Sequence, residues 1–254
     1  MGIKDWFGGD KKKEAFREKA KEALSGKLRP GKAAELAKVA QQHDIENPAD
    51  DKTQLRRDIY NKAAGAVKAQ GKLSEGEAAE LAKIQKFLAL RDDQVERTKW
   101  DLAKLRTLTE IRKGHLPVVP PTSAAMRGVQ LLPGESPHYA VPVDVLDRAS
   151  AGGMPGVRVK WNTPYVINSA KGHAFPAEGS KELGGGYLFI TNKRLFFKGE
   201  NRSAAVEYSP SANFFLYGEG IRLERTVGHT LLQFKSRSDE TAEIVGELLS
   251  ALMR

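Results

Sequence analysis

A cluster of prolines near the middle of the chain separates two stretches whose compositions favour different secondary structures. Pro117, Pro120 and Pro121 lack the backbone N–H that a helix requires, so an extended linker is predicted here. Before the linker the chain is rich in Ala, Lys, Glu and Leu, which favours helices. From about Val129, short β-branched and aromatic runs alternate with Gly, Asn and Pro, which favours strands. The sequence therefore predicts an α+β protein.

The predicted boundaries follow from this break. Residues 1–9 are expected to form a flexible N-terminal tip and residues 10–115 an all-α domain. Residues 116–128 form the linker, and residues 129–254 form an antiparallel β domain. Two modest domains suit a chain of 254 residues. Apolar residues at helical spacing between 239 and 252 predict a C-terminal helix that closes the β domain.

The helical half contains an internal repeat. The segment Gly26–Val39 returns as Gly71–Ile84, with ten of fourteen positions identical. Each copy has a Gly-Lys-Leu turn followed by the pattern of a new helix, so a duplicated helix–turn–helix bundle is predicted. In the second copy Ser74 precedes Glu77 by three residues, which is the spacing of a capping box at a helix start.

This duplicated pattern resembles a pair of EF-hands. A calcium loop needs oxygen ligands at its first, third and fifth positions, a glycine at the sixth and a glutamate at the twelfth. Placing Gly71 at the sixth position puts Glu77 at the twelfth, but the ligand positions hold Ala66, Lys68 and Gln70. The resemblance therefore implies an EF-hand-like or tellurite-resistance-B-like helical module without a metal site. The alternative is a generic bundle whose turns use Gly-Lys-Leu.

The second half contains a hairpin signature. Residues 186–197 place two apolar runs around the polar turn Thr-Asn-Lys-Arg, and a second hairpin is predicted between 213 and 225. The 186–197 segment is similar to the signature hairpin of GRAM and bacterial pleckstrin-homology-like domains. Leu131–Glu135 resembles the Leu-x-Pro-Gly-Glu segment that precedes that fold.

The resemblance covers residues 129–254 and implies a pleckstrin-homology-like fold. Residues 150–183 are long for this family, and two interpretations stay open for them, extra strands or a mobile loop. Such domains are binding modules that recognise lipid headgroups, peptides or other domains, so a non-enzymatic protein is expected. Lipid-binding members use bases on an early hairpin, and the corresponding bases here are Lys193, Arg194, Lys198 and Arg202. The alternative is a solvated turn without a ligand.

No catalytic, metal-binding or cofactor-binding motif stands out in the sequence. The chain has no cysteine, which excludes disulfides and thiol chemistry. Its five histidines include no pair at helical metal-ligand spacing, and no glycine-rich phosphate loop precedes a helix. We therefore predict no catalytic residue, no metal and no cofactor.

The net charge is +9, and most of it lies in the first half. Residues 1–115 carry 26 bases and 19 acids, whereas residues 116–254 carry 15 and 13. A basic half can bind nucleic acid, so a nucleic-acid-binding protein that uses the helical half is the alternative function. The acids are interspersed with the bases, which weakens this alternative.

The N-terminus offers a candidate membrane anchor, in which apolar side chains lie beside cations. Its residues are Ile3, Trp6, Phe7, Lys11, Lys12 and Lys13. The alternative is that the aromatic side chains pack onto the bundle. No apolar run is long enough to span a membrane. At the N-terminus, charged residues interrupt the chain before an apolar core of the kind found in signal peptides develops. The sequence predicts a cytoplasmic adaptor that binds a protein partner or an anionic membrane surface. Peripheral attachment to the inner membrane face and the oligomeric state stay open.

Overall fold

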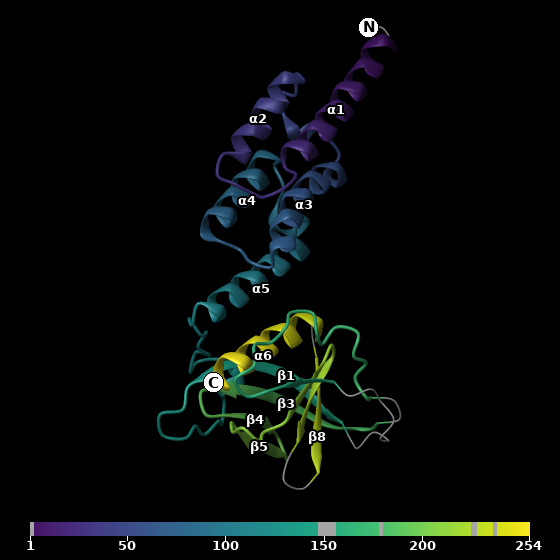
Figure 1. Cartoon of the computed structure of the whole chain (residues 1–254). Coiled ribbons are helices and arrows are strands. Elements are labelled where there is room, and N and C mark those ends of the chain that lie inside the picture. Colours follow the sequence, from purple (N-terminus) through teal and green to yellow (C-terminus); the bar gives the residue numbers. More distant parts are fainter. Residues whose placement is uncertain (1–2, 147–155, 178–179, 225–227, 236–237) are drawn as a thin grey trace. The chain divides into compact units, whose positions relative to one another are not determined.

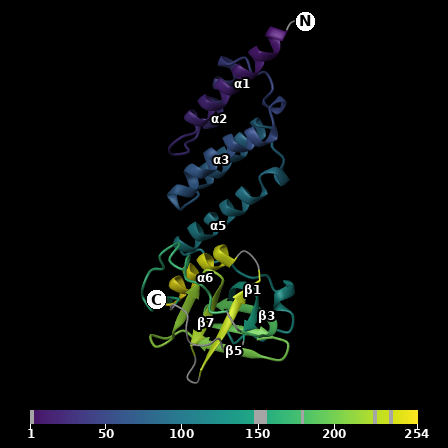
Figure 2. The ribbon, with the colours of Figure 1, turned by 90° about the vertical axis from the view of Figure 1, so that its right-hand side faces the viewer.

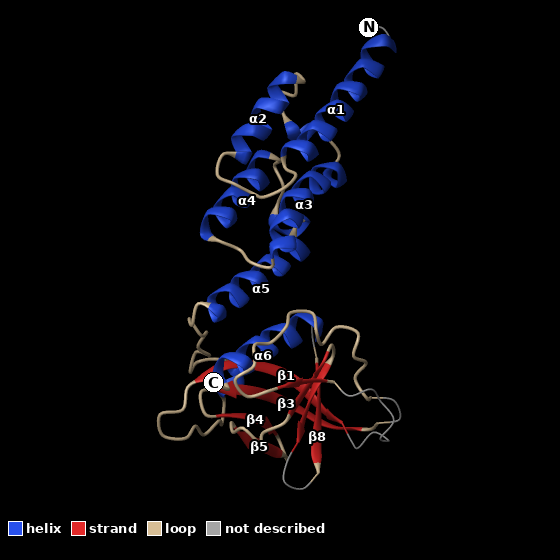
Figure 3. Cartoon of the chain, viewed as in Figure 1, coloured by secondary structure: helices blue, strands red, loops and turns tan. Residues whose placement is uncertain are grey.

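The computed structural model describes the chain except for residues 1–2, 147–155, 178–179, 225–227 and 236–237, and for residues 3–10 and 238–239 it describes the backbone alone. Contacts divide the chain into two compact units, Met1–Thr109 and Glu110–Arg254 (Figure 1). The first unit is helical, and the second contains an eight-stranded sheet and a long helix (Figure 3). The predicted α+β class is confirmed.

The helical unit has its own core, formed by apolar side chains of its helices and turns. Among the largest fully buried side chains are Leu36, Ile59, Tyr60 and Ile84. Gly8 and Gly9 do not interrupt the first helix, which begins at Ile3, within the segment expected to be a flexible tip. The elements are α1 (Ile3–Ala23), α2 (Lys32–Gln42), η1 (Pro48–Asp50), α3 (Thr53–Gln70), α4 (Glu75–Phe87), η2 (Asp92–Gln94) and α5 (Glu96–Arg112), whose last three residues belong to the second unit.

The two repeat copies form equivalent turns between helices. Gly26 and Gly71 both adopt positive φ, 75° and 65°, where a residue with a β-carbon is strained. The leucines of the two Gly-Lys-Leu turns are buried in the core. The predicted capping box is confirmed, because the Ser74 hydroxyl accepts the Glu77 N–H and the Glu77 carboxylate accepts the Ser74 N–H at 2.9 Å.

The first copy starts its helix in a different way. Gly31 precedes α2 and has no side chain with which to cap it. Instead, the Glu80 carboxylate of α4 accepts the N–H groups of Gly31 at 3.1 Å and Ala33 at 2.7 Å. A negative charge is favourable at a helix N-terminus, so Glu80 joins the two repeats. Nothing in the local sequence around α2 indicates this long-range cap.

The β unit consists of one antiparallel sheet with strand order β2-β6-β7-β8-β1-β3-β4-β5. The predicted hairpins are β3–β4 and β6–β7, and the predicted C-terminal helix is α6. The elements are η3 (Ala124–Met126), β1 (Pro137–Leu146), β2 (Val157–Val159), β3 (Glu182–Thr191), β4 (Arg194–Gly199), β5 (Ser203–Glu207), β6 (Phe214–Tyr217), β7 (Gly220–Glu224), β8 (His229–Phe234) and α6 (Ser238–Leu252).

Both faces of the sheet carry packed side chains. On one face, α6 covers the strands and contributes to the main core (Figures 1 and 2). On the other face, the rings of Phe189 and Phe196 stack with centroids 4.8 Å apart. Ala125 of η3 joins these rings in a second cluster. Residues of the predicted 116–128 linker therefore contribute to the packing of the β unit.

Part of the long 150–183 segment covers α6. Strand β2 pairs with β6, which agrees with the interpretation as an extra strand. The Tyr165 N–H donates to the Ser250 hydroxyl at 3.0 Å, and the Asn168 N–H donates to the Glu243 carboxylate at 2.8 Å. Because both acceptors belong to α6, the described part of this segment holds the closing helix against the sheet.

Candidate functional site

The hairpin signature and the Leu-x-Pro-Gly-Glu segment meet at one buried carboxylate. The Glu135 side chain has no exposed surface, and it pairs with Arg194, whose side chain is 18% exposed. Arg194 donates to both carboxylate oxygens, at 2.9 and 3.1 Å. The Thr191 hydroxyl donates at 2.8 Å and the Leu132 N–H at 2.7 Å. Four hydrogen bonds thus compensate for removing the charge of Glu135 from water.

These contacts also set the protonation of Glu135. Burial opposes ionisation, but the hydrogen bonds from Arg194, Leu132 and Thr191 outweigh it and hold the pKa of this carboxyl below its ordinary value. Glu135 is therefore ionised at neutral pH, and its charge is paired with the guanidinium. Arg194 also lies over the ring of Phe196, 4.7 Å from its centroid.

The rest of the turn is fastened to the same segment. The Ser136 N–H donates to the Asn192 side-chain oxygen at 2.8 Å, and the Asn192 amide donates to the Gly134 carbonyl at 3.0 Å. The Lys193 ammonium donates to the Pro133 carbonyl. Two of the four candidate bases, Lys193 and Arg194, are thus engaged in holding the hairpin tip to residues 132–136.

Beside this structure lies a cleft on the outer face of β4 and β5. It has a volume of about 400 Å³ and is lined in part by Arg194 and Lys198, two of the predicted bases. Its other lining residues come from the 128–130 segment and the two strands, namely Gly128, Val129, Gln130, Phe196, Phe197, Ser203, Ala204 and Ala205. Lys198 and Arg202 are exposed, and within the described part of the chain neither forms an ion pair. The cleft therefore offers polar contacts and, among the described residues, a Lys198 ammonium that no acid pairs.

The register explains why these side chains meet. Successive residues of a strand point to opposite faces, so Arg194, Phe196 and Lys198 share the outer face of β4. Across the ladder, Lys198 lies opposite Ser203 and Phe196 lies opposite Ala205. The small side chains on β5 leave the space that forms the cleft. Sequence reasoning identified the bases but missed Gln130, Ser203 and Ala205, because polar and small residues carry no chemical signal without the register.

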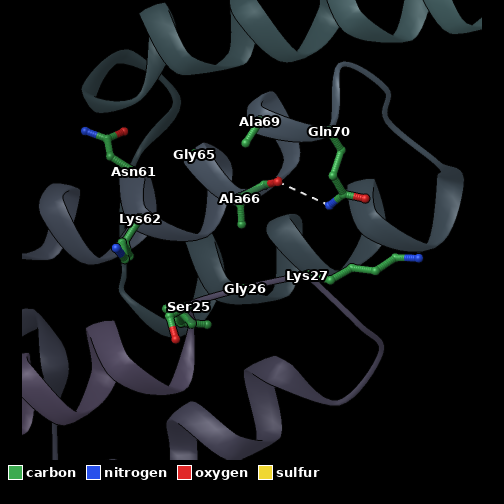
Figure 4. Close-up of a pocket in the computed structure, with 10 residues that line it drawn as sticks. Ser25, Gly26, Lys27, Asn61, Lys62, Gly65, Ala66, Ala69 and Gln70 are labelled. Atoms are coloured by element: carbon green, nitrogen blue, oxygen red, sulfur yellow. Dashed lines mark hydrogen bonds between the residues drawn. The ribbon is translucent and has the colours of Figure 1, made fainter.

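A second cavity, of about 510 Å³, lies within the helical unit (Figure 4). It is bounded by the turn after α1 and by one side of α3, where Gly65, Ala66 and Ala69 have small side chains. The Gln70 amide donates to the Ala66 carbonyl at 3.1 Å. Lys27 and Lys62 also line this cavity, which combines an apolar wall with two bases.

The structure describes the side chains of only some of the residues in the candidate membrane anchor. Ile3, Trp6 and Phe7 lie in α1, but their side chains fall outside the described part. Lys12 forms an exposed ion pair with Asp44 at 2.8 Å, and Lys13 donates to the Asp50 carbonyl at 3.3 Å. Such exposed contacts contribute little to stability. Lys11 is exposed on the same helix.

The described part of the chain holds no candidate for a membrane span or for a metal centre. Within that part of the chain, no helix is long and apolar enough to cross a bilayer. In the same residues, no group of three or more His, Asp or Glu side chains is arranged to hold a metal ion.

No protein-family model matches the chain, and no curated protein matches it.

Proposed function

We propose that the chain is a non-enzymatic adaptor whose β unit is a pleckstrin-homology-like binding domain. The strand order supports this proposal, because β3, β4 and β5 form one meander with β1 beside β3, and β6, β7 and β8 form a second meander to which β2 adds beside β6. The two meanders join through β1 and β8, and α6 packs against the sheet. The helical unit is proposed to be an EF-hand-like or tellurite-resistance-B-like module that acts without a metal.

We further propose that the outer cleft binds an acidic side chain of a protein partner. The observation that carries this proposal is the exposed Lys198, which lines a cleft of about 400 Å³ and forms no ion pair within the described part of the chain. A carboxylate of the partner can pair with the Lys198 ammonium, while polar lining residues such as Ser203 and Gln130 can form further hydrogen bonds with it. A flat anionic membrane would be served less well, since Lys193 and Arg194 already hold the hairpin tip.

The test is a titration of the full-length, isotope-labelled protein with a short glutamate-rich peptide, followed by amide chemical shifts. We expect shifts at Gly128 and Lys198 in the wild type. The double variant Lys198→Glu/Arg202→Glu should lose them. A matched control, Lys160→Glu/Lys171→Glu, makes the same change of charge at exposed positions outside the cleft and should bind normally.

Three results would contradict the proposal. They are a peptide that shifts no cleft residue, unchanged binding by the cleft variant, and equal loss in the control. Vesicles of phosphatidylcholine and phosphatidylserine form the second arm. If the wild type sediments with these vesicles and the cleft variant does not, the ligand of the cleft is an anionic membrane and the proposed protein partner is wrong.

A further inference from the structure

Strand β5 (Ser203–Glu207) is an edge of the sheet. It is the last strand in the order, and among the described residues it pairs with β4 alone. Ser203, Ala205 and Glu207 are exposed, and none of them forms a backbone hydrogen bond with a described segment beyond the β4–β5 ladder. An uncovered edge presents a row of backbone donors and acceptors to which another strand can add.

The ladder shows which backbone groups face outward. The Gly199 N–H donates to the Arg202 carbonyl at 2.9 Å, and the Tyr208 N–H donates to the Lys193 carbonyl at 3.3 Å. Backbone groups of an antiparallel strand alternate in direction, so Arg202, Ala204, Val206 and Tyr208 face β4. The N–H and C=O groups of Ser203, Ala205 and Glu207 therefore face away from the sheet.

The β5 edge also lacks the usual features that prevent strand addition. Its sequence, Ser-Ala-Ala-Val-Glu, has no proline or lysine, and its pairing with β4 runs without a bulge. The opposite edge of the sheet differs, because β2 is three residues long and carries Arg158 at its centre. Short edges with a charge at their centre are protected against pairing, whereas β5 is longer and carries its one charge at its last residue, Glu207.

We propose that β5 pairs with β5 of a second copy of this chain, antiparallel and about a two-fold axis at Ala205. In this register the two Ala205 residues face each other, and each Ser203 faces Glu207 of the second copy. Hydroxyl and carboxylate can then form a hydrogen bond, and no like charges are opposed. An axis at Glu207 would oppose two carboxylates, and an axis at Ser203 would pair fewer residues.

On the other face of the two paired strands, the side chains that would meet are also compatible with this register. Ala204 would face Val206 of the second copy, and Val206 already packs against the main core. Three outward residues on each strand supply about six backbone hydrogen bonds. A contact of this size is smaller than a standard stable interface, so the dimer should be weak and should depend on concentration. This inference goes beyond the proposed function, because it needs no foreign partner.

The experiment measures the molar mass of the full-length protein by light scattering over a series of concentrations. We expect the wild type to rise from 27.9 kDa toward twice that value. Ala205→Asp and Ala205→Lys each place like charges at the axis and should stay monomeric. An equimolar mixture of the two should dimerise again, since opposite charges then meet.

Two further variants guard against misfolding and non-specific effects. Ala205→Ser is the matched control and should dimerise like the wild type. Ala205→Pro removes only the outward N–H, a position where proline is tolerated at an edge, and should be monomeric with an unchanged circular dichroism spectrum. A monomeric wild type at every concentration overturns the proposal, as do charged variants that still dimerise separately or a mixture that stays monomeric.

Discussion

At the scale of single residues, Glu135 determines how the β4 hairpin tip is held. A buried carboxylate is costly unless it is paired and hydrogen-bonded, and Glu135 receives donors from Leu132, Thr191 and Arg194. Removing one member of such a pair leaves the other without compensation. The ion pair between Glu135 and Arg194 is therefore important for the stability of the fold, although Arg194 is partly exposed.

The first prediction concerns the loss of this carboxylate. Glu135→Ala should lower the free energy of unfolding by about 3 to 5 kcal/mol, because Arg194 keeps its charge in a mostly buried position. Denaturant unfolding measures the change, with the exposed Glu200→Ala as control, for which we expect a change within about 0.5 kcal/mol. The double variant Glu135→Leu/Arg194→Met should lose less stability than Glu135→Leu alone. Equal losses in the single and double variants would refute the pairing.

The second prediction concerns acid. The pKa of Glu135 is lower in the folded state than its ordinary value of 4.5. Its ionised form thus adds stability that is fully present above that value and is lost as pH falls through the folded pKa. We expect the difference in unfolding free energy between the wild type and Glu135→Gln to shrink as pH drops below about 4.5. A difference that stays constant with pH would contradict this assignment.

At the scale of elements, two helical glycines have opposite surroundings. In α6, a β-carbon at Gly246 would lie 2.6 Å from the ring of Tyr165, which packs over this helix. In α3, a β-carbon at Gly65 would meet no atom within 4 Å. Helix propensity favours alanine equally at both sites, so any difference reports tertiary packing.

The third prediction uses this pair. Gly65→Ala should raise the free energy of unfolding by up to about 1 kcal/mol, the gain in helix propensity. Gly246→Ala should lower it, because overpacking costs about 1 to 3 kcal/mol and exceeds that gain. Thermal unfolding of the two variants gives the comparison. A stabilising Gly246→Ala would mean that Tyr165 does not pack against α6.

At the scale of the whole molecule, each unit has a separate hydrophobic core. Ile84 belongs to the core of the helical unit, and Leu248 belongs to that of the β unit. Both side chains are fully buried. The net charge is likewise uneven, since the first half carries most of the excess bases.

The fourth prediction tests the separation of the cores. Ile84→Ala and Leu248→Ala should each cost about 2 to 5 kcal/mol, through lost burial and a cavity. Hydrogen exchange read by peptide should show that Ile84→Ala speeds exchange in the helical unit and Leu248→Ala in the β unit. If either variant accelerated exchange equally in both units, the two cores would form one cooperative structure.

The sequence by itself determined the elements whose causes are local. Composition separated helices from strands, Ser74 and Glu77 marked the start of α4, and the Thr-Asn-Lys-Arg turn located the β3–β4 hairpin. Capping, turn conformation and periodicity depend on residues within a few positions of one another. Lys198 on β4 and Arg202 before β5 were candidates only through the resemblance to a family, and the structure leaves both exposed.

Only the tertiary structure decided which distant groups meet. Glu135 and Arg194 are 59 positions apart, and Glu80 caps α2 across 47 to 49 positions. These partners depend on how the chain closes in three dimensions, which neither propensity nor spacing encodes. The strand register then placed Lys198 beside the cleft and committed Arg194 to Glu135, and the strand order left β5 at an edge.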